Sequence, residues 1–285
     1  MNKYLVLIVL IVSILGLSLF LLYPGEKTIY TMWTALRVKG DGREVAIAEA
    51  RRLNDLFNRF DPSSEVAAIN LAAGLNPVKV SRETFDVIAL SLLIADLSGG
   101  AFDISLGEHG NWREIKLNSQ AETVFLALKG MKIDLGGIGK GFAIEKIKRL
   151  LGGKKGNKTL VDMRSSIAAI GRSWKIGVLD PRLTGAGGRD RILGAVILND
   201  GETLATSGGY EQPGHIIDPR SGQKAEKCLG VTVIAQDAAI ADALATAIFV
   251  LGPEKGMALA EKLAARAVII DRKGKIYDNF GFKLR

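Results

Sequence analysis

The 285-residue sequence has little of what several common classes of site require. A single cysteine, Cys228, excludes a disulfide framework, and two histidines, His109 and His215, are too few for a histidine-rich metal centre. The sequence contains no CxxC, HExxH or dinucleotide-binding fingerprint. Aromatic residues make up only 6% of the chain and are not interleaved with basic runs, so the net charge of +8 suits an anionic ligand or a membrane surface and does not indicate nucleic acid.

One long apolar run is present, near the start of the sequence. Residues 4–23 carry no charge, and the run has about the length of a helix that crosses a hydrocarbon core of roughly 30 Å. It ends without the small-x-small site of a cleaved signal and without a cysteine for lipidation. We therefore predict a signal anchor at 1–23, in preference to a buried core helix, and a tether at 24–30. Lys3 precedes the run, which favours a working domain outside the cytoplasmic membrane.

Strand and helix patterns are interspersed along residues 31–285 without regular βαβ alternation. This mixture predicts one α+β domain. Apolar spacing and capping residues predict helices at 44–60, from Ser63 or Ser64 to Asn70, from Ser81 to Gly99, after Gly137, from Asp237 to Leu251 and at 254–265. Alternating or continuous apolar runs predict strands at 28–38, 131–135, 159–163, 174–179, 192–198, within 203–218, at 229–235 and at 266–271.

Asp242 and Thr246 lie four residues apart on a predicted helix that is otherwise apolar. Their side chains therefore project from one face. A carboxylate on such a helix is costly to bury unless it is paired or bound to a cation, and Mg²⁺ accepts carboxylate, hydroxyl and carbonyl oxygens. The structural alternative is an aspartate on a solvated stripe and a threonine bonded to its own helix. From the spacing alone, this alternative is the favoured one.

A glycine-rich segment, Asp134-Leu-Gly-Gly-Ile-Gly-Lys-Gly141, joins a predicted strand to a predicted helix. Glycines allow a phosphate to approach the backbone closely, and a helix N-terminus favours negative charge. The segment is not a Walker A loop, because Asp134 stands at the first required glycine and Gly141 at the final Ser or Thr. An anionic ligand and a simple strand-to-helix turn remain equally good interpretations.

Two further segments contain groups that could act on a ligand. His215 precedes an Asp-Pro turn and could serve as a general base, or it could only order the turn. Phe102 and Asp103 follow a glycine pair and could clasp a planar ring, or Phe102 could be a core residue. Met32 and Trp33 could also flank a ring, but on their own they are better explained as packing residues.

Together these segments resemble the ApbE family of FAD:protein FMN transferases. The resemblance covers about Met32 to Gly252, and the motifs occur in the family's order. They are MWT at 32–34, FDPSSEVAAIN at 60–70, GGAFDISLG at 99–107, DLGGIGKGFA at 134–143, ATSGGY at 205–210, HIIDPRSG at 215–222 and ADALATAIFVLG at 241–252.

The resemblance implies a two-lobed domain that uses FAD and Mg²⁺, transfers FMN to a Ser or Thr hydroxyl of an acceptor protein and releases AMP. It implies that Asp242 and Thr246 bind the metal together with the carbonyl of Gly137, and that His215 is the base. It also implies that the FAD site is lined by Met32, Phe60, Ala101, Phe102, Asp103, Asp134, Lys140 and Ile217. The implied acceptors are flavin-carrying subunits of membrane redox complexes, which agrees with an anchor in the cytoplasmic membrane.

The sequence departs from the family in three loops. The segments between Gly107 and Met131 and between Ser207 and His215 are short, and residues 162–166 read DMRSS where a Gly-Gly-Asp turn is usual. Three alternatives to the transferase therefore stay open. The first is an FAD pyrophosphatase in which water replaces the hydroxyl, the second a non-catalytic, membrane-anchored FAD-binding subunit, and the third a tethered domain for another nucleotide.

Overall fold

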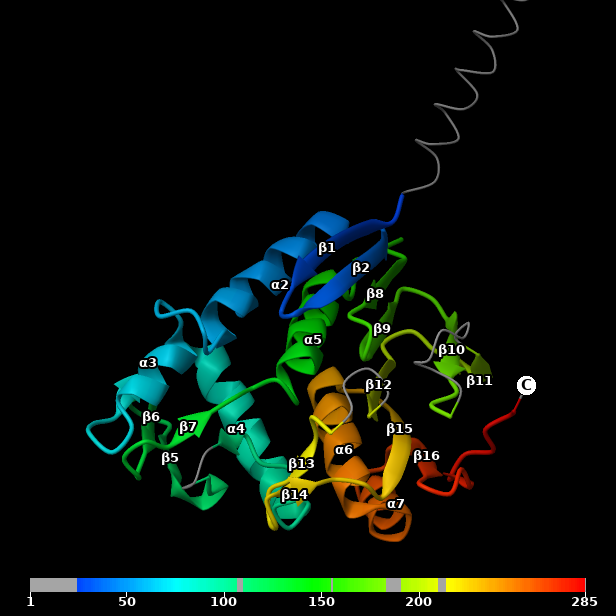
Figure 1. Ribbon diagram of the computed structural model, residues 1–285. Helices are drawn as coiled ribbons and strands as arrows, with labels where there is room; N and C mark the ends of the chain where they lie inside the picture. The colour runs from blue at the N-terminus through cyan, green and yellow to red at the C-terminus, as the bar shows by residue number, and fades with distance from the viewer. Residues whose placement is uncertain (1–24, 107–109, 155, 183–190, 210–213, 285) are drawn as a thin grey trace, which may run out of the picture.

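The structure is a computed structural model that describes residues 25–106, 110–154, 156–182, 191–209 and 214–284. The predicted anchor at 1–23 lies outside these residues. Among the described helices, none combines the length and the apolar character that a membrane crossing requires. Helices and antiparallel sheets are mixed along the chain, so the α+β prediction is confirmed (Figure 1).

An eight-stranded sheet forms the centre of the described structure, in the order β1-β2-β8-β9-β12-β15-β16-β17. Every neighbouring pair is antiparallel. The order follows the chain closely, because hairpins and helical crossovers join neighbouring strands. The strands are β1 (Lys27–Thr31), β2 (Thr34–Gly40), β8 (Thr159–Asp162), β9 (Ser166–Ile170), β12 (Thr203–Gly208), β15 (Cys228–Ala235), β16 (Arg266–Asp271) and β17 (Ile276–Asp278).

The two faces of this sheet bury different apolar layers. Val233 of β15 packs into the large helix-side core, whereas its neighbour Ile234 packs into a smaller core on the opposite face. This alternation is the period of two that a strand imposes. The helix side is covered by α2 (Arg43–Phe57), α5 (Gly139–Leu151), α6 (Ala238–Leu251) and α7 (Pro253–Lys262), and the smaller core by the hairpin β10 (Trp174–Leu179) and β11 (Ile192–Leu198).

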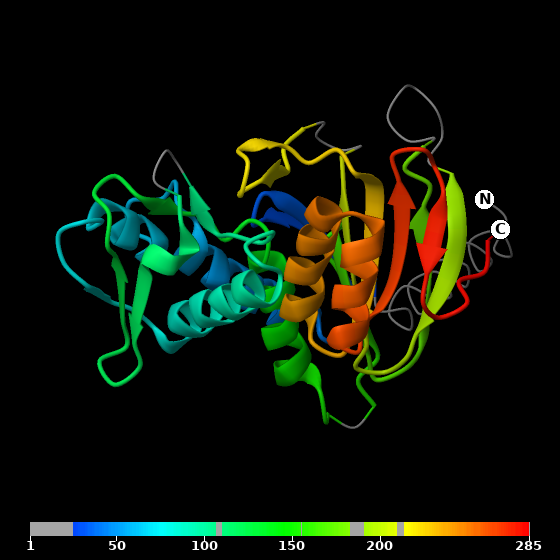
Figure 2. The ribbon, with the colours of Figure 1, turned by 90° about the horizontal axis from the view of Figure 1, so that it is seen from below.

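A second group of elements lies at one end of the sheet and gives the molecule its elongated shape (Figure 2). Its apolar residues, such as Ile88 and Val124, belong to the same helix-side core, so the two parts share one interior. The group contains α3 (Glu65–Leu71), α4 (Arg82–Leu97), the 3-10 helix η1 (Trp112–Glu114) and the small strands β3 (Val78–Lys79), β4 (Ser105–Leu106), β5 (Ile115–Asn118), β6 (Thr123–Leu126) and β7 (Lys132–Ile133). A last short pair, β13 (Ile217–Asp218) and β14 (Gln223–Lys224), lies near α6.

Three predicted helix starts are confirmed in atomic detail. The side chains of Ser64, Ser81 and Asp237 each accept a hydrogen bond from the first turn of their helix. Such caps depend only on neighbouring residues, so a sequence pattern is sufficient to locate them.

The single strand predicted at 28–38 is wrong, because the structure has a hairpin there. Met32 and Trp33 form its turn with φ of 49° and 59°, values that favour glycine or asparagine. The sequence has neither residue at these positions, so the usual turn signal is absent. Strand β1 begins at Lys27, inside the segment predicted as a tether. The strands that were not predicted are β3, β4, β5, β6, β9, β14 and β17, and the strand expected at 131–135 is reduced to two residues.

Candidate active site

A cleft of about 1300 Å³ opens between the eight-stranded sheet, helices α5 and α6, and the second group of elements. All of the site residues that the sequence analysis selected lie in its wall, although they come from six separate segments. They are Met32, Phe60, Ala101, Phe102, Asp103, Asp134, Gly137, Lys140, His215, Ile217, Asp242 and Thr246.

Asp242 is the most buried acid of the cleft, with an exposed fraction of only 5%. The solvated stripe that the spacing alone favoured is therefore wrong for this residue. Its Oδ2 accepts the Gly141 N–H at 2.9 Å and its Oδ1 accepts the Ser166 hydroxyl at 3.0 Å. Burial raises the pKa of Asp242, although the charge of Lys140 and the two hydrogen bonds oppose that rise.

Thr246 lies one helical turn beyond Asp242, and its hydroxyl is 3.2 Å from the hydroxyl of Ser207 on β12. It also bonds to the Asp242 carbonyl at 3.4 Å, so the predicted bond to its own helix does form. A Cβ added to Gly137 would stand 3.8 Å from the Thr246 hydroxyl, which places the glycine backbone beside this group. We call the cleft residues Asp242, Thr246 and Ser207, together with Ser166, which is buried behind Asp242, the floor of the cleft.

The glycine-rich segment serves helix packing as well as the cleft. A Cβ at Gly141 would come within 2.3 Å of the Ala238 carbonyl oxygen and 2.5 Å of the Asp242 Cβ. Only glycine allows α5 and α6 to approach this closely. Gly141, which stands where a Walker A loop has Ser or Thr, is thus the residue whose N–H donates to Asp242.

Asp134 and Lys140 stand at the two ends of the same turn. Asp134 accepts the Gly136 N–H at 2.8 Å, and its other oxygen is 2.9 Å from Arg59 Nε, in an ion pair without good hydrogen-bond direction. Lys140 Nζ donates to the Gly136 carbonyl at 3.2 Å. Both charged groups remain in the cleft wall, where a diphosphate would meet the positive one.

Phe102 and Asp103 support the cleft from behind. Phe102 is buried, and its ring would be 3.1 Å from a Cβ at Gly137, so it packs beneath the glycine turn. Asp103 accepts the N–H groups of Ser105 at 2.7 Å and Trp112 at 3.2 Å, and burial raises its pKa. In this structure, its oxygens therefore link the backbone at Ser105 to the backbone at Trp112.

The mouth of the cleft has exposed aromatic side chains. Trp33 and Phe60 are 66% and 63% exposed, and their rings meet edge to face at 5.5 Å. The Arg59 guanidinium lies 4.3 Å from the Phe60 ring centroid. His215 and Ile217 are exposed on the wall that bears β13. We call Trp33, Phe60, His215 and Ile217 the rim.

The Asp-Pro turn after His215 is held by its own arginine. The Asp218 carboxylate accepts two bonds from the Arg220 guanidinium, at 2.8 and 2.7 Å, and this pairing lowers the pKa of Asp218. The turn therefore has an internal support, and His215 lies at its start, facing the cleft.

Several cleft residues were not selected from the sequence. Asp162, Arg164 and Ser165 of the altered DMRSS segment line the cleft, and Ser166 of the same segment is buried behind them, on Asp242. Asp162 accepts the Arg164 N–H at 2.7 Å, and burial raises its pKa. The sequence did mark this segment as a departure from the family pattern. However, the pairing of β8 with β9 in the sheet, which brings the segment beside α6, cannot be read from the sequence.

The floor suits a hard cation better than a transition metal. Within the described ranges, no group of three or more His, Cys, Asp and Glu side chains could hold a metal. Zinc and related ions normally require such a group. The floor instead offers a buried carboxylate whose two donors, Gly141 N–H and the Ser166 hydroxyl, are neutral, next to two hydroxyls and the Gly137 backbone. This oxygen set fits Mg²⁺.

Comparison with known proteins gives a consistent result. The model of the ApbE family matches residues 27–270. A Klebsiella pneumoniae protein named FAD:protein FMN transferase is 31% identical over 73% of this chain and 75% of its own length. A Treponema pallidum protein with the same name is 34% identical over 71% of this chain and 68% of its own.

Solved structures share the fold. The crystal structure of the ApbE protein of Thermotoga maritima superposes with a TM-score of 0.81 at 26% identity and covers 90% of this chain and 97% of that one. The flavin transferase ApbE of Vibrio cholerae has the same fold at 22% identity, with a TM-score of 0.77. With the family match extending over most of the sequence and the predicted residues gathered in one cleft, the chain belongs to the ApbE family.

Proposed function

We propose that the protein is an FAD:protein FMN transferase that moves FMN from FAD to a Ser or Thr hydroxyl of an acceptor protein. The observation that carries this proposal is the floor, where Asp242 is buried beside hydroxyl groups at the bottom of a cleft large enough for a dinucleotide. The names of the relatives support the same activity.

In this reaction, the acceptor oxygen forms a bond to the FMN phosphorus while the phosphoanhydride bond to AMP breaks. AMP leaves with the electron pair of that bond, and the hydroxyl proton passes to a base. His215 is our candidate for the base, because it is the described histidine on the rim and imidazole can accept a proton near neutral pH. Lys140, at the edge of the glycine turn, would hold the diphosphate by its charge.

The residues of the floor would hold magnesium. Asp242 would supply the carboxylate, Thr246 and Ser207 would supply hydroxyls, and the neighbouring Gly137 would supply its carbonyl. A bound Mg²⁺ acts as a Lewis acid and offsets the negative charge of a diphosphate. The protein's own contribution is to position the groups and exclude water, which carries most of the catalysis in phosphoryl transfer.

The rim would hold the flavin and admit the acceptor. Phe60, Met32 and Ile217 all line the cleft and offer apolar surface for a planar ring. Because the rim is exposed, a protein-bound hydroxyl can reach the ligand from outside. The acceptor class that we propose is a flavin-carrying subunit of a membrane redox complex.

The test is the mass of the acceptor after incubation. Full-length protein with FAD, Mg²⁺ and a panel of such subunits should produce an acceptor that is heavier by one FMN and should release one AMP per adduct. Chelation with EDTA should prevent both products. An acceptor whose mass stays unchanged while folded enzyme releases AMP at the same rate with and without it would identify a pyrophosphatase instead.

We also propose that residues 1–23 anchor the protein in the cytoplasmic membrane with the cleft on the outer side. The support is the charge-free run of the sequence. The full chain should stay with the membrane fraction after an alkaline carbonate wash, and a variant that lacks residues 1–23 should not. Release of both proteins by the wash would contradict the anchor.

A further inference from the structure

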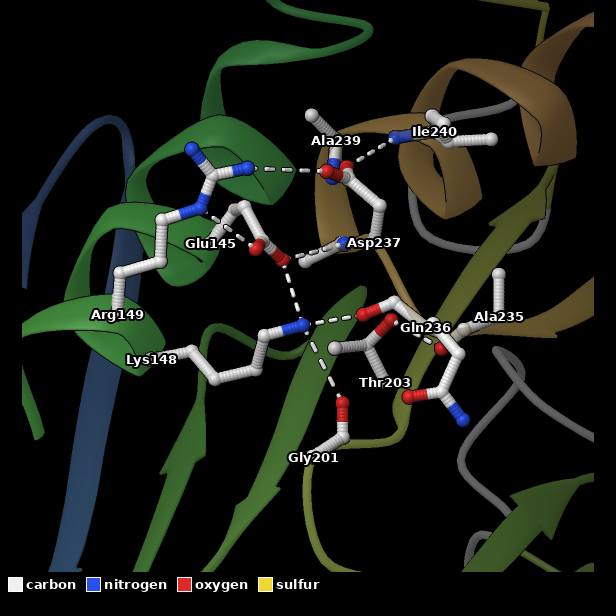
Figure 3. Close-up of polar contacts among 11 residues, drawn as sticks. Glu145, Lys148, Arg149, Gly201, Thr203, Ala235, Gln236, Asp237, Ala239 and Ile240 are labelled. Atoms are coloured by element: carbon white, nitrogen blue, oxygen red, sulfur yellow. Dashed lines mark hydrogen bonds and ion pairs between the residues drawn. The ribbon is translucent and has the colours of Figure 1, made fainter. Parts of the chain in front are cut away.

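A cluster of charged side chains fastens α5 to the first turn of α6 (Figure 3). At its centre, the buried Glu145 carboxylate pairs with Lys148 Nζ at 2.7 Å and with Arg149 Nε at 3.0 Å. Lys148 also donates to the carbonyls of Gly201 and Gln236. Although burial raises the pKa of Glu145, these cations and the Ala238 N–H together hold that pKa below its ordinary value. The cluster lies outside the cleft, and the proposed reaction does not use it.

The cluster also satisfies the start of α6. Glu145 Oε2 accepts the Ala238 N–H at 3.1 Å, and Asp237 Oδ1 accepts the N–H groups of Ala239 and Ile240 at 2.9 and 3.0 Å. These are the first three N–H groups of the helix, which have no partner within it. Asp237 is a local cap, whereas Glu145 comes from another helix. Its bond therefore fixes the position of α5 relative to α6.

The two helices contact each other at two points that lie one helical turn apart. Ala238 and Asp242 are four residues apart on α6, and Gly141 and Glu145 are four residues apart on α5, so each pair lies on one face. Glu145 contacts Ala238, and Gly141 contacts Asp242. The donor of the Gly141 contact is a backbone N–H, so a slide of α5 along α6 would move it directly relative to the Asp242 carboxylate.

We propose that Glu145 is a positioning residue for Asp242, because its bond to the Ala238 N–H fixes α5 on α6 and so keeps the Gly141 N–H on the Asp242 carboxylate. The inference rests on the proposed function in one respect, since it treats the aligned carboxylate as a magnesium ligand. Partners that orient a ligand typically change metal affinity by about 10- to 100-fold when they are removed.

Glu202 provides a matched control for the ion pair. Its Oε1 is 2.8 Å from Arg266 and its Oε2 accepts the Asn199 N–H at 2.8 Å, so it too combines a cation and a backbone N–H. Its side chain is 14% exposed, against 10% for Glu145, and like Glu145 it lies outside the cleft lining, but these two partners belong neither to α5 nor to α6. Glu202→Ala should lower stability without moving Asp242.

The experiment compares Glu145→Ala, Glu145→Gln and Glu202→Ala in the full-length protein. One readout is hydrogen exchange at the Gly141 amide without ligands, and the other is the dissociation constant for Mg²⁺ alone, measured by calorimetry. Glu145→Ala should speed the exchange and weaken Mg²⁺ binding, each about 10-fold or more. Glu145→Gln keeps an acceptor oxygen for Ala238 and should change each less than about 3-fold, and Glu202→Ala should change neither.

The proposal is overturned if folded Glu145→Ala matches Glu202→Ala in both readouts. If Glu145→Ala does not fold, Glu145→Asp takes its place, because it keeps the charge but shortens the reach. It should then weaken Mg²⁺ binding more than Glu145→Gln does, and the opposite order would contradict the positioning role. If the unaltered protein binds no Mg²⁺, the metal part of the proposed function fails, while Gly141 exchange still tests the helix contact.

Discussion

The floor and the rim of the cleft differ in how their side chains meet solvent. Asp242 and Ser166 of the floor are buried and bonded to each other, and Thr246 and Ser207 are bonded and half-buried. The rim residues are exposed, and Trp33 stands in a turn with an unfavourable backbone conformation. Floor geometry is thus set by packing before any ligand arrives, whereas the rim side chains lie at the solvent-exposed entrance. The difference suggests that the floor determines the chemistry and the rim determines what is bound.

The largest effect should come from the floor. Asp242→Ala removes the carboxylate that we assign to magnesium, so we expect FMN transfer to fall by about 1000-fold or more, as for loss of a central electrostatic group. Acceptor mass and AMP release measure this. Asp96→Ala is the control, since that acid lies on α4 outside the cleft lining and should leave the rate unchanged. A loss of less than about 10-fold in Asp242→Ala would show that the floor does not take part in the reaction.

A smaller effect should come from the rim. Trp33→Ala and Phe60→Ala each remove exposed aromatic surface, so the Tm should stay within about 2 °C, because exposed substitutions change stability little. We expect the KM for FAD or acceptor to rise about 10-fold, with a smaller change in kcat. A fall in kcat at unchanged KM would show that the rim takes part in the chemistry and would contradict the separate roles assigned to floor and rim.

The smallest effect should be a gain in stability. Burial raises the folded-state pKa of Asp242 above its unfolded value of 3.8, so the ionised carboxylate destabilises the metal-free protein at neutral pH. Asp242→Asn should therefore raise the Tm by about 3 °C at pH 7. The amide can accept from the Gly141 N–H and donate to the Ser166 hydroxyl, so the bonds persist.

The stability gained by Asp242→Asn depends on pH, because only the ionised form of the Asp242 carboxyl is destabilising. The advantage of Asp242→Asn should shrink as the pH falls towards 3.8, because the unaltered carboxyl is then protonated in both states. Mg²⁺ should stabilise the unaltered protein more than the variant, since only the former offers a carboxylate. Thermal melts at pH 7 and pH 4.5, with and without Mg²⁺, measure both trends. A variant that is less stable than the unaltered protein at pH 7 would contradict the account.

Much of the site could be predicted because its residues fall into short motifs with local causes. Asp237 caps α6, which fixes where that helix begins, and the four-residue step from Asp242 to Thr246 then fixes their shared face. The turn at Met32 and Trp33 could not be predicted, because neither residue favours a positive φ. Tertiary pairing of β1 with β2 imposes it.

The sequence by itself determined the class of the fold, three of the helix starts and the identity of many of the residues that line the cleft, since each depends on neighbours in the chain or on ordered motifs. Only the tertiary structure decided how deeply those residues are buried and which residues they contact. It buried Asp242, brought Ser166 from an altered loop to its side, and set Glu145 and Gly141 of α5 against the start of α6. The physical reason is that burial and helix contact join residues about 100 positions apart, and no local pattern records such distances.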